Sequence, residues 1–118
     1  MNKITLLGRL VKDPEVQYTQ GGKCVAKITL AVDRPFSKDK KEADFIPVVL
    51  WDKQAELVGN SCQKGHRLLV DGRLQIRSYD GKDGQKRWVT EVIANSMEFI
   101  EKKEQKTMES LGEDVPFE

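Results

Sequence analysis

The sequence of 118 residues has few of the residue types on which enzymes and metal-binding proteins depend. It contains one histidine, His66, and two cysteines. It has no GxxxxGK[ST] phosphate loop, and no serine, cysteine or carboxylate stands at a recognised motif spacing from His66. The sequence therefore lacks the residues that ATP hydrolysis, metal-dependent nuclease chemistry and triad catalysis require. We expect a protein that is not an enzyme and that uses no metal and no cofactor.

The cysteines and the first residues of the chain indicate the cellular compartment in which the protein works. Cys24 and Cys62 are far apart and form no CxxC motif, which favours buried, reduced thiols, with a disulfide between them as the open alternative. The first residues lead directly into an alternating strand pattern, without a secretory, transit or membrane segment. We therefore expect a cytoplasmic protein with no membrane partner.

The formal charge of the whole chain is only +1, but it is distributed unevenly. From residue 101 onward, six acidic residues stand against three lysines, a net charge of −3, so residues 1–100 carry +4. With 118 residues and 38% apolar content, the chain has room for one domain with one core. We expect a mildly basic domain over residues 1–100 and a disordered acidic tail, a short flexible linker with a tip, over residues 101–118.

Alternation of apolar and polar residues predicts an all-β domain with one short helix. The strands are expected at residues 3–10, 25–32, 45–51, 68–79 and 86–100, and the helix at residues 53–62. Gly21-Gly22 predicts a hairpin between the first two strands. The inward row of the fourth strand is expected to be Leu68, Val70, Gly72, Leu74 and Ile76. Five strands with a helix between the third and the fourth have the order of an OB-fold, a five-stranded Greek-key barrel.

The third strand is apolar on both faces. Ile46, Val48 and Leu50 form an ordinary core row, while the opposite row consists of Phe45, Pro47, Val49 and Trp51. The rings of this second row suit the stacking of unpaired nucleic-acid bases, and burial under a helix or a subunit is the alternative. Because Pro47 has no N–H to donate, we expect an edge, a bulge or an open seam of the barrel beside it.

Other aromatic residues recur on the segments that carry cations. The aromatic candidates for base stacking are Phe36, Phe45, Trp51, Tyr79 and Trp88. The candidates for phosphate contacts are Arg34, Lys38, Lys53, Arg73, Arg77, Lys82, Lys86 and Arg87. Taken one by one, the lysines could simply keep the surface soluble, Arg77 with Tyr79 could be a surface pair, and Trp88 could lie at the rim of the core. Taken together, the interleaved rings and cations predict binding of single-stranded nucleic acid.

Several motifs resemble those of the bacterial-type single-stranded DNA-binding proteins (SSB). They are Asn2-Lys3-Ile4, Leu7-Gly8, Asp13-Pro14-Glu15-Val16, Val48-Val49-Leu50-Trp51, Asp71-Gly72-Arg73-Leu74 and Thr90-Glu91-Val92. The resemblance covers residues 1–100 and implies an OB-fold that assembles as a homotetramer and binds unpaired DNA without strong sequence preference. The resemblance places the stacking rings of the family on Phe36, Phe45, Trp51 and Tyr79, and it matches Trp88 to an aromatic residue of the same hairpin. Whether a cell or a phage encodes the chain stays open.

The end of the chain carries a second motif of the same family. Its acidic tip consists of Glu113, Asp114, Val115, Pro116 and Phe117. The resemblance implies that this tip docks replication and repair proteins, with the acids steering and Phe117 filling a pocket. The linker is shorter than is common in the family, and the chain ends in Glu118 rather than at the phenylalanine. The alternatives are a frayed terminus, and, for the whole chain, a primosome-type accessory protein or an RNA-binding OB module.

Overall fold

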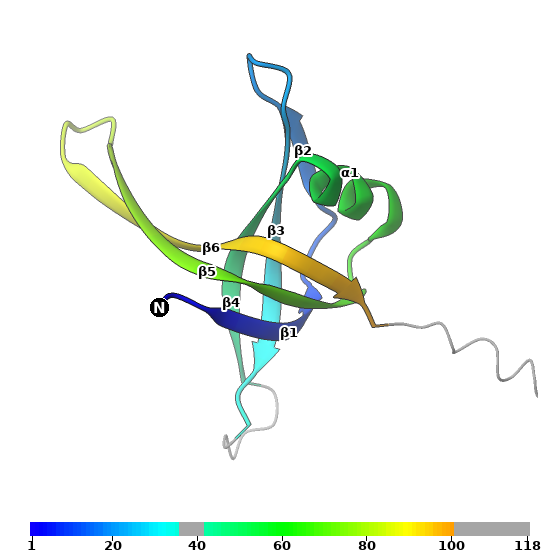
Figure 1. Cartoon of the computed structure of the whole chain (residues 1–118). Helices are drawn as coiled ribbons and strands as arrows, with labels where there is room; N and C mark the ends of the chain where they lie inside the picture. The colour runs from blue at the N-terminus through cyan, green and yellow to red at the C-terminus, as the bar shows by residue number, and fades with distance from the viewer. Residues whose placement is uncertain (36–41, 101–118) are drawn as a thin grey trace, which may run out of the picture.

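Six strands and one helix form the part of the protein that the structure describes (Figure 1). The structure is a computed structural model, and it describes residues 1–35 and 42–100. The elements are β1 (Ile4–Leu10), β2 (Glu15–Tyr18), β3 (Cys24–Asp33), β4 (Ala43–Trp51), α1 (Asp52–Ser61), β5 (Arg67–Asp80) and β6 (Lys86–Phe99). Among these residues no helix has the length and apolar character needed to cross a membrane.

The strands close into a barrel. Their order is β1-β5-β6-β4-β3-β2, and β1 also pairs with β3 through Arg9↔Ala31 and Leu10↔Leu30, which closes the ring. All pairings are antiparallel except that of β4 with β6, which consists of Val48↔Val92 and Val49↔Ile93. With α1 packed against β2, β3 and β4, this is the predicted OB-fold, and the prediction is confirmed.

The beginning of the barrel differs from the expected hairpin. The turn at Gly21-Gly22 joins β3 to the short strand β2, and not to β1. β1 instead runs antiparallel to β5 from Ile4↔Gly72 to Arg9↔Arg67. The first strand of the barrel is therefore interrupted around Asp13-Pro14, where proline cannot donate to a ladder. All four residues of β2 are exposed. The strand therefore has no inward apolar row from which it could be predicted.

The core lies inside the barrel and under the helix. The inward rows of β3, β4 and β5 meet Ala55 and Val58 of α1 there. Cys24 and Cys62 belong to the same cluster, and both are free and buried, which confirms the prediction of reduced thiols. Burial raises the pKa of the Cys62 thiol to about 11.

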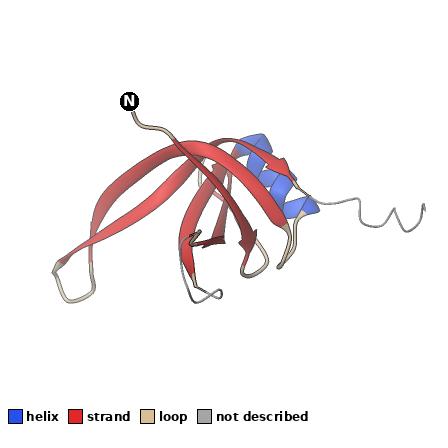
Figure 2. Ribbon diagram, turned by 90° about the horizontal axis from the view of Figure 1, so that it is seen from below, coloured by secondary structure: helices blue, strands red, loops and turns tan. Residues whose placement is uncertain are grey.

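β5 and β6 continue beyond the barrel as a two-stranded hairpin, which Figures 1 and 2 show reaching away from the other strands. For this reason the predicted inward row of β5 is wrong in its second half: Leu74 is 41% and Ile76 60% exposed. The hairpin is held where it leaves the barrel. There the side chain of Asn2 donates to the Leu74 carbonyl at 2.8 Å and accepts from the Leu74 N–H at 2.9 Å.

Candidate nucleic-acid interface

The aromatic row of β4 lies on the outside of the barrel. Phe45 is 69% and Trp51 39% exposed, whereas Val48 and Leu50 of the opposite row are fully buried. Alternation along the strand separates the two rows, because successive side chains point to opposite faces. Within the described part of the chain, the rings of Phe45 and Trp51 are therefore displayed and not covered.

Pro47 lies at an open seam, as its missing N–H predicts. It pairs with Thr29 of β3 on one side. On the other side, the pairing of β4 with β6 starts only at the next residue, Val48↔Val92. No ladder to β6 therefore needs a donor from Pro47.

The registers of the β5–β6 hairpin decide which candidate residues share a face. Residues that pair directly across a ladder point to the same side of the sheet. The pairs Arg77↔Val89 and Tyr79↔Arg87 alternate with Ser78↔Trp88. Tyr79, Arg77 and Arg87 consequently share one face of the hairpin, and Trp88 lies on the other.

The face of Tyr79 is continuous with the aromatic row of β4. Arg73 pairs with Ile93, and Ile93 also pairs with Val49, the central residue of that row. The structure thus brings Arg73, Arg77, Tyr79 and Arg87 onto the same outer face as Phe45 and Trp51. We call the surface made by these six residues the outer face.

Trp88 does not belong to the outer face. It is on the side of the hairpin that continues the inward rows, with Ser78 opposite to it and Ile76 nearby in the ladder. Its side chain is 67% exposed, so it is not a rim residue of the core either. Sequence alone groups Trp88 with the other rings because it does not show the register of the hairpin.

The arginine candidates all have partners within the described residues. Arg34 donates from Nε and Nη2 to Asp44 Oδ1, at 3.0 and 2.8 Å, and this bonding raises the pKa of its guanidinium. The other pairs are Arg77–Glu91 at 2.9 Å, Arg87–Asp83 at 2.8 Å and Arg73–Gln75 at 3.2 Å. By contrast, the lysine candidates Lys53, Lys82 and Lys86 make no hydrogen bond or ion pair with residues 1–35 or 42–100, and their charges are available to a ligand.

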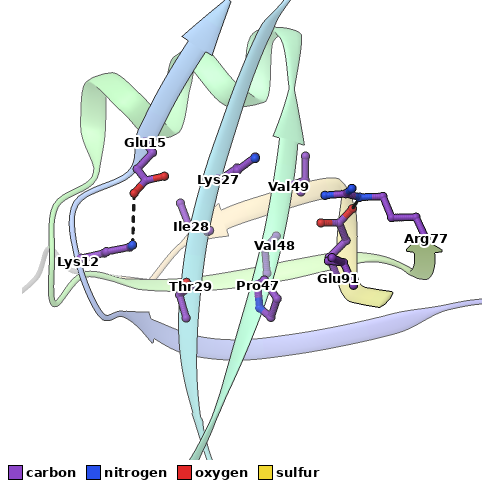
Figure 3. Close-up of a pocket in the computed structure, with 11 residues that line it drawn as sticks. Lys12, Glu15, Lys27, Ile28, Thr29, Pro47, Val48, Val49, Arg77 and Glu91 are labelled. Carbon is purple, nitrogen blue, oxygen red and sulfur yellow. Dashed lines mark hydrogen bonds and ion pairs between the residues drawn. The ribbon is translucent and has the colours of Figure 1, made fainter. Parts of the chain in front are cut away.

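A cavity of about 250 Å³ lies in the middle of the outer face, between β3, β4 and the hairpin (Figure 3). Figure 3 shows the Lys12–Glu15 pair on one side of it and the Arg77–Glu91 pair on the other, with β3 and β4 between them. Lining residues that the sequence analysis did not name as candidates for DNA binding are Lys12, Glu15, Lys27, Ile28, Thr29, Val48, Val89 and Glu91. Lys27 and Thr29 alternate with the inward residues of β3, and this alternation was a usable signal. Glu91 lies in the Thr90-Glu91-Val92 motif, but the motif alone does not show that its side chain lines a cavity.

Some candidates lie outside the described residues. These are Phe36 and Lys38, which lie in the sequence between β3 and β4, and the tip residues Glu113, Asp114, Val115, Pro116 and Phe117. In the part of the chain that the structure describes, no group of three His, Cys, Asp or Glu side chains could hold a metal ion. The described site consists of exposed rings, cations and a cavity with both charged and apolar walls.

Comparison with known proteins shows to which family the chain belongs. Residues 1–100 match the model of the family described as "Single-strand binding protein family". "Single-stranded DNA-binding protein 3" of Clostridium acetobutylicum is 55% identical over 103 residues, which cover 86% of this chain and 72% of the relative. "Single-stranded DNA-binding protein 2" of the same organism is 49% identical over 118 residues, covering 98% and 89%. "Single-stranded DNA-binding protein" of Clostridium tetani is 55% identical, covering 86% and 71%. The chain therefore belongs to the single-strand binding protein family.

Proposed function

We propose that the protein binds single-stranded DNA without strong sequence preference. The observation that carries this proposal is the shared outer face, on which the exposed rings of Phe45, Trp51 and Tyr79 lie beside three arginines. Unpaired bases stack on such rings, and the phosphates between them follow the cations. The protein has no chemical step to perform; the matched relatives are named for binding.

From the same geometry we expect duplex DNA to be a poor ligand. In a duplex the bases are already stacked on one another, so exposed rings gain nothing from them. Cations alone would attract duplex and single strand alike, because both carry phosphates. Discrimination therefore rests on the rings of the outer face.

The remaining candidates extend the path of the strand. Trp88 lies on the second face of the hairpin and offers a base a stacking partner there, so a bound strand passes around the hairpin rather than along one side of it. Lys38, Lys53, Lys82 and Lys86 supply phosphate contacts, and Phe36 supplies a further ring on which a base can stack. By covering the bases and phosphates in this way, the protein would protect unpaired DNA during replication, recombination and repair.

Titration with oligo-dT, followed by tryptophan fluorescence, tests the proposal. Stacking on Trp51 and Trp88 should quench the emission, and log affinity should fall with log salt at a slope of about −0.7 per phosphate neutralised. A duplex of the same length should bind far more weakly. Equal affinity for the duplex and the single strand would refute the proposal.

We further propose that four copies assemble into a homotetramer. Among the described residues, Ile4 to Gly8 of β1 pair only with β5, so one edge of this segment is free to pair with a second copy. Leu7 is exposed beside that edge. Light scattering should give about four times the chain mass of 13.4 kDa. A monomer mass at micromolar concentration would contradict this assembly.

The acidic tip completes the proposed function by docking replication and repair proteins. Glu113 and Asp114 provide charge for a basic patch, and Phe117 provides an apolar anchor. We also propose that the protein works in the cytoplasm, at the nucleoid, where it would meet unpaired DNA. Removal of residues 113–118 should weaken the binding of a partner while oligo-dT still binds. A partner that binds the shortened chain with unchanged affinity would exclude this role.

A further inference from the structure

Within residues 1–35 and 42–100, three arginines have carboxylate partners, and they are held in three different ways. Arg34 uses Nε and Nη2 for Asp44 and has Nη1 at 3.5 Å from Glu42, so its whole guanidinium faces acids. Arg87 gives its terminal Nη2 to Asp83 at 2.8 Å. Arg77 differs from both, because it donates to Glu91 Oε2 from Nε, at 2.9 Å. The terminal nitrogens of Arg77 have no hydrogen-bond partner among residues 1–35 and 42–100.

The point of attachment decides what a guanidinium can still bind. A phosphate is bound best by two parallel N–H donors of the planar fork. A carboxylate at a terminal nitrogen removes one of these donors, whereas a carboxylate at Nε leaves both terminal nitrogens available. Of these three arginines, Arg77 is therefore the one whose fork is held in place and still open to an anion.

Glu91 is well suited to hold Arg77. Its side chain lies in the wall of the cavity and the residue is only 6% exposed, while about half of the Arg77 side chain remains exposed. The same oxygen, Oε2, also accepts from Gln75 Nε2 at 3.4 Å. Glu91 is thus anchored on β6 and Gln75 on β5, so the carboxylate has little freedom to follow a moving arginine. Because Glu91 holds Nε in one place, the two exposed terminal nitrogens of Arg77 keep a fixed position.

From this geometry we infer that Glu91 is a positioning residue for DNA binding: it presents the two terminal nitrogens of Arg77 to one phosphate of the strand on the outer face. The inference rests on the proposed function, since it names the phosphate contact at the centre of the same site. Val49 and Pro47 lie beside this contact in the cavity (Figure 3), so a base next to that phosphate meets an apolar surface.

A plain Coulombic view predicts the opposite role for Glu91. An acidic side chain in a DNA-binding groove repels phosphates, and its removal should then strengthen binding. If Glu91 positions Arg77, its removal should weaken binding, although a negative charge is lost. The sign of the change therefore separates the two views.

The test compares Glu91→Ala and Arg77→Lys with the unaltered full chain in oligo-dT binding, measured by fluorescence anisotropy over a range of salt concentrations. We expect each substitution to weaken binding about tenfold, the equivalent of one charge-assisted hydrogen bond. Glu91→Ala should also make the salt slope shallower by about 0.7, the value for one lost phosphate contact. In the Arg77→Ala background, Glu91→Ala should cause no further loss.

Two further substitutions separate the loss of the acceptor oxygen from the loss of the negative charge. Glu91→Gln keeps an acceptor oxygen and should restore the salt slope that Glu91→Ala loses. Asp83→Asn removes a carboxylate from the same hairpin, but from a terminal nitrogen of Arg87, and should make binding equal or tighter. Circular dichroism shows whether each variant is folded. If Glu91→Ala unfolds, Arg77→Lys decides alone, because lysine keeps the charge but has neither Nε nor the fork.

The outcomes are separate from those of the proposed function. If the unaltered chain does not bind oligo-dT, both the function and this inference are wrong. If it binds, and folded Glu91→Ala binds equally well or better with the same salt slope, the inference alone is overturned. Full affinity of Arg77→Lys would also overturn it.

Discussion

At the scale of single residues, the outer face is defined by rings that the fold leaves in water. Phe45, Trp51 and Tyr79 keep apolar area exposed, and that area favours any partner that covers it. The bases of an unpaired strand are such a partner, since every base has a flat apolar face. The rings have no partner among the described residues for their exposed area, whereas Arg77 and Arg87 already pair with carboxylates of the chain.

We predict that Trp51→Ala and Tyr79→Ala each weaken oligo-dT binding by about 1–3 kcal/mol, the contribution of one stacked base. The fold should survive because neither side chain belongs to the buried core cluster. Fluorescence anisotropy measures the affinity, and circular dichroism the fold. Tyr18→Ala is the matched control, since Tyr18 is also an exposed ring but lies on β2 next to α1. If all three variants bind like the unaltered chain, the rings do not stack with DNA.

At the scale of elements, the β5–β6 hairpin depends on how it is attached to the barrel. A two-stranded hairpin has little stability of its own. Here it is the continuation of two barrel strands, and Gly72 lies where they leave the barrel, at an irregularity in the ladder. A Cβ on Gly72 would overlap the carbonyl oxygen of Ile93 and stand 2.9 Å from the carbonyl carbon. The close approach of β5 and β6 therefore requires glycine at this position.

Gly72→Ala should consequently lower the free energy of unfolding by about 3 kcal/mol or more, because a backbone atom and not a flexible side chain has to move. Urea denaturation measures this loss. Gly22→Ala is the control: Gly22 has a φ of +86°, but no atom lies within 4 Å of the place that a Cβ would occupy, so it should cost only about 1–2 kcal/mol. Equal losses for the two variants would show that the contact with Ile93 does not matter.

At the scale of the whole molecule, closure of the barrel produces one continuous core that contains both thiols. Burial raises the pKa of Cys62 from its ordinary value of 9.0 to about 11, because the thiolate would be poorly solvated there. The folded protein thus holds the Cys62 proton more tightly than the unfolded chain does. This contribution to stability is complete below pH 9 and is lost as the pH rises toward 11.

We therefore expect the free energy of unfolding to fall between pH 9 and pH 11 more steeply for the unaltered chain than for Cys62→Ala. Lysines and tyrosines also titrate in this range, so only the difference between the two proteins reports on Cys62. Urea titrations under reducing conditions at a series of pH values provide both curves. Parallel curves would show that burial does not affect the thiol in this way.

Much of the domain could be predicted from local patterns. The core rows of β3 and β4, the shared face of Phe45 and Trp51, and the seam beside Pro47 all follow from alternation or from the missing N–H of proline. The strand β2 could not be predicted in this way because all of its residues are exposed. Alternation wrongly places Leu74 and Ile76 in the core, because it shows two faces of a strand and not where the barrel ends.

Local sequence was enough to set the helix and the longer strands, the core rows of β3 and β4, and the residue types available to a single strand of DNA, because these depend on neighbours a few residues apart. Which of those residues share a surface was settled only when the strands paired. The register of β5 against β6 puts Tyr79 and Trp88 on opposite faces, and it places Glu91 beside Arg77. Register and pairing join residues that are distant in the chain, so no local pattern contains them.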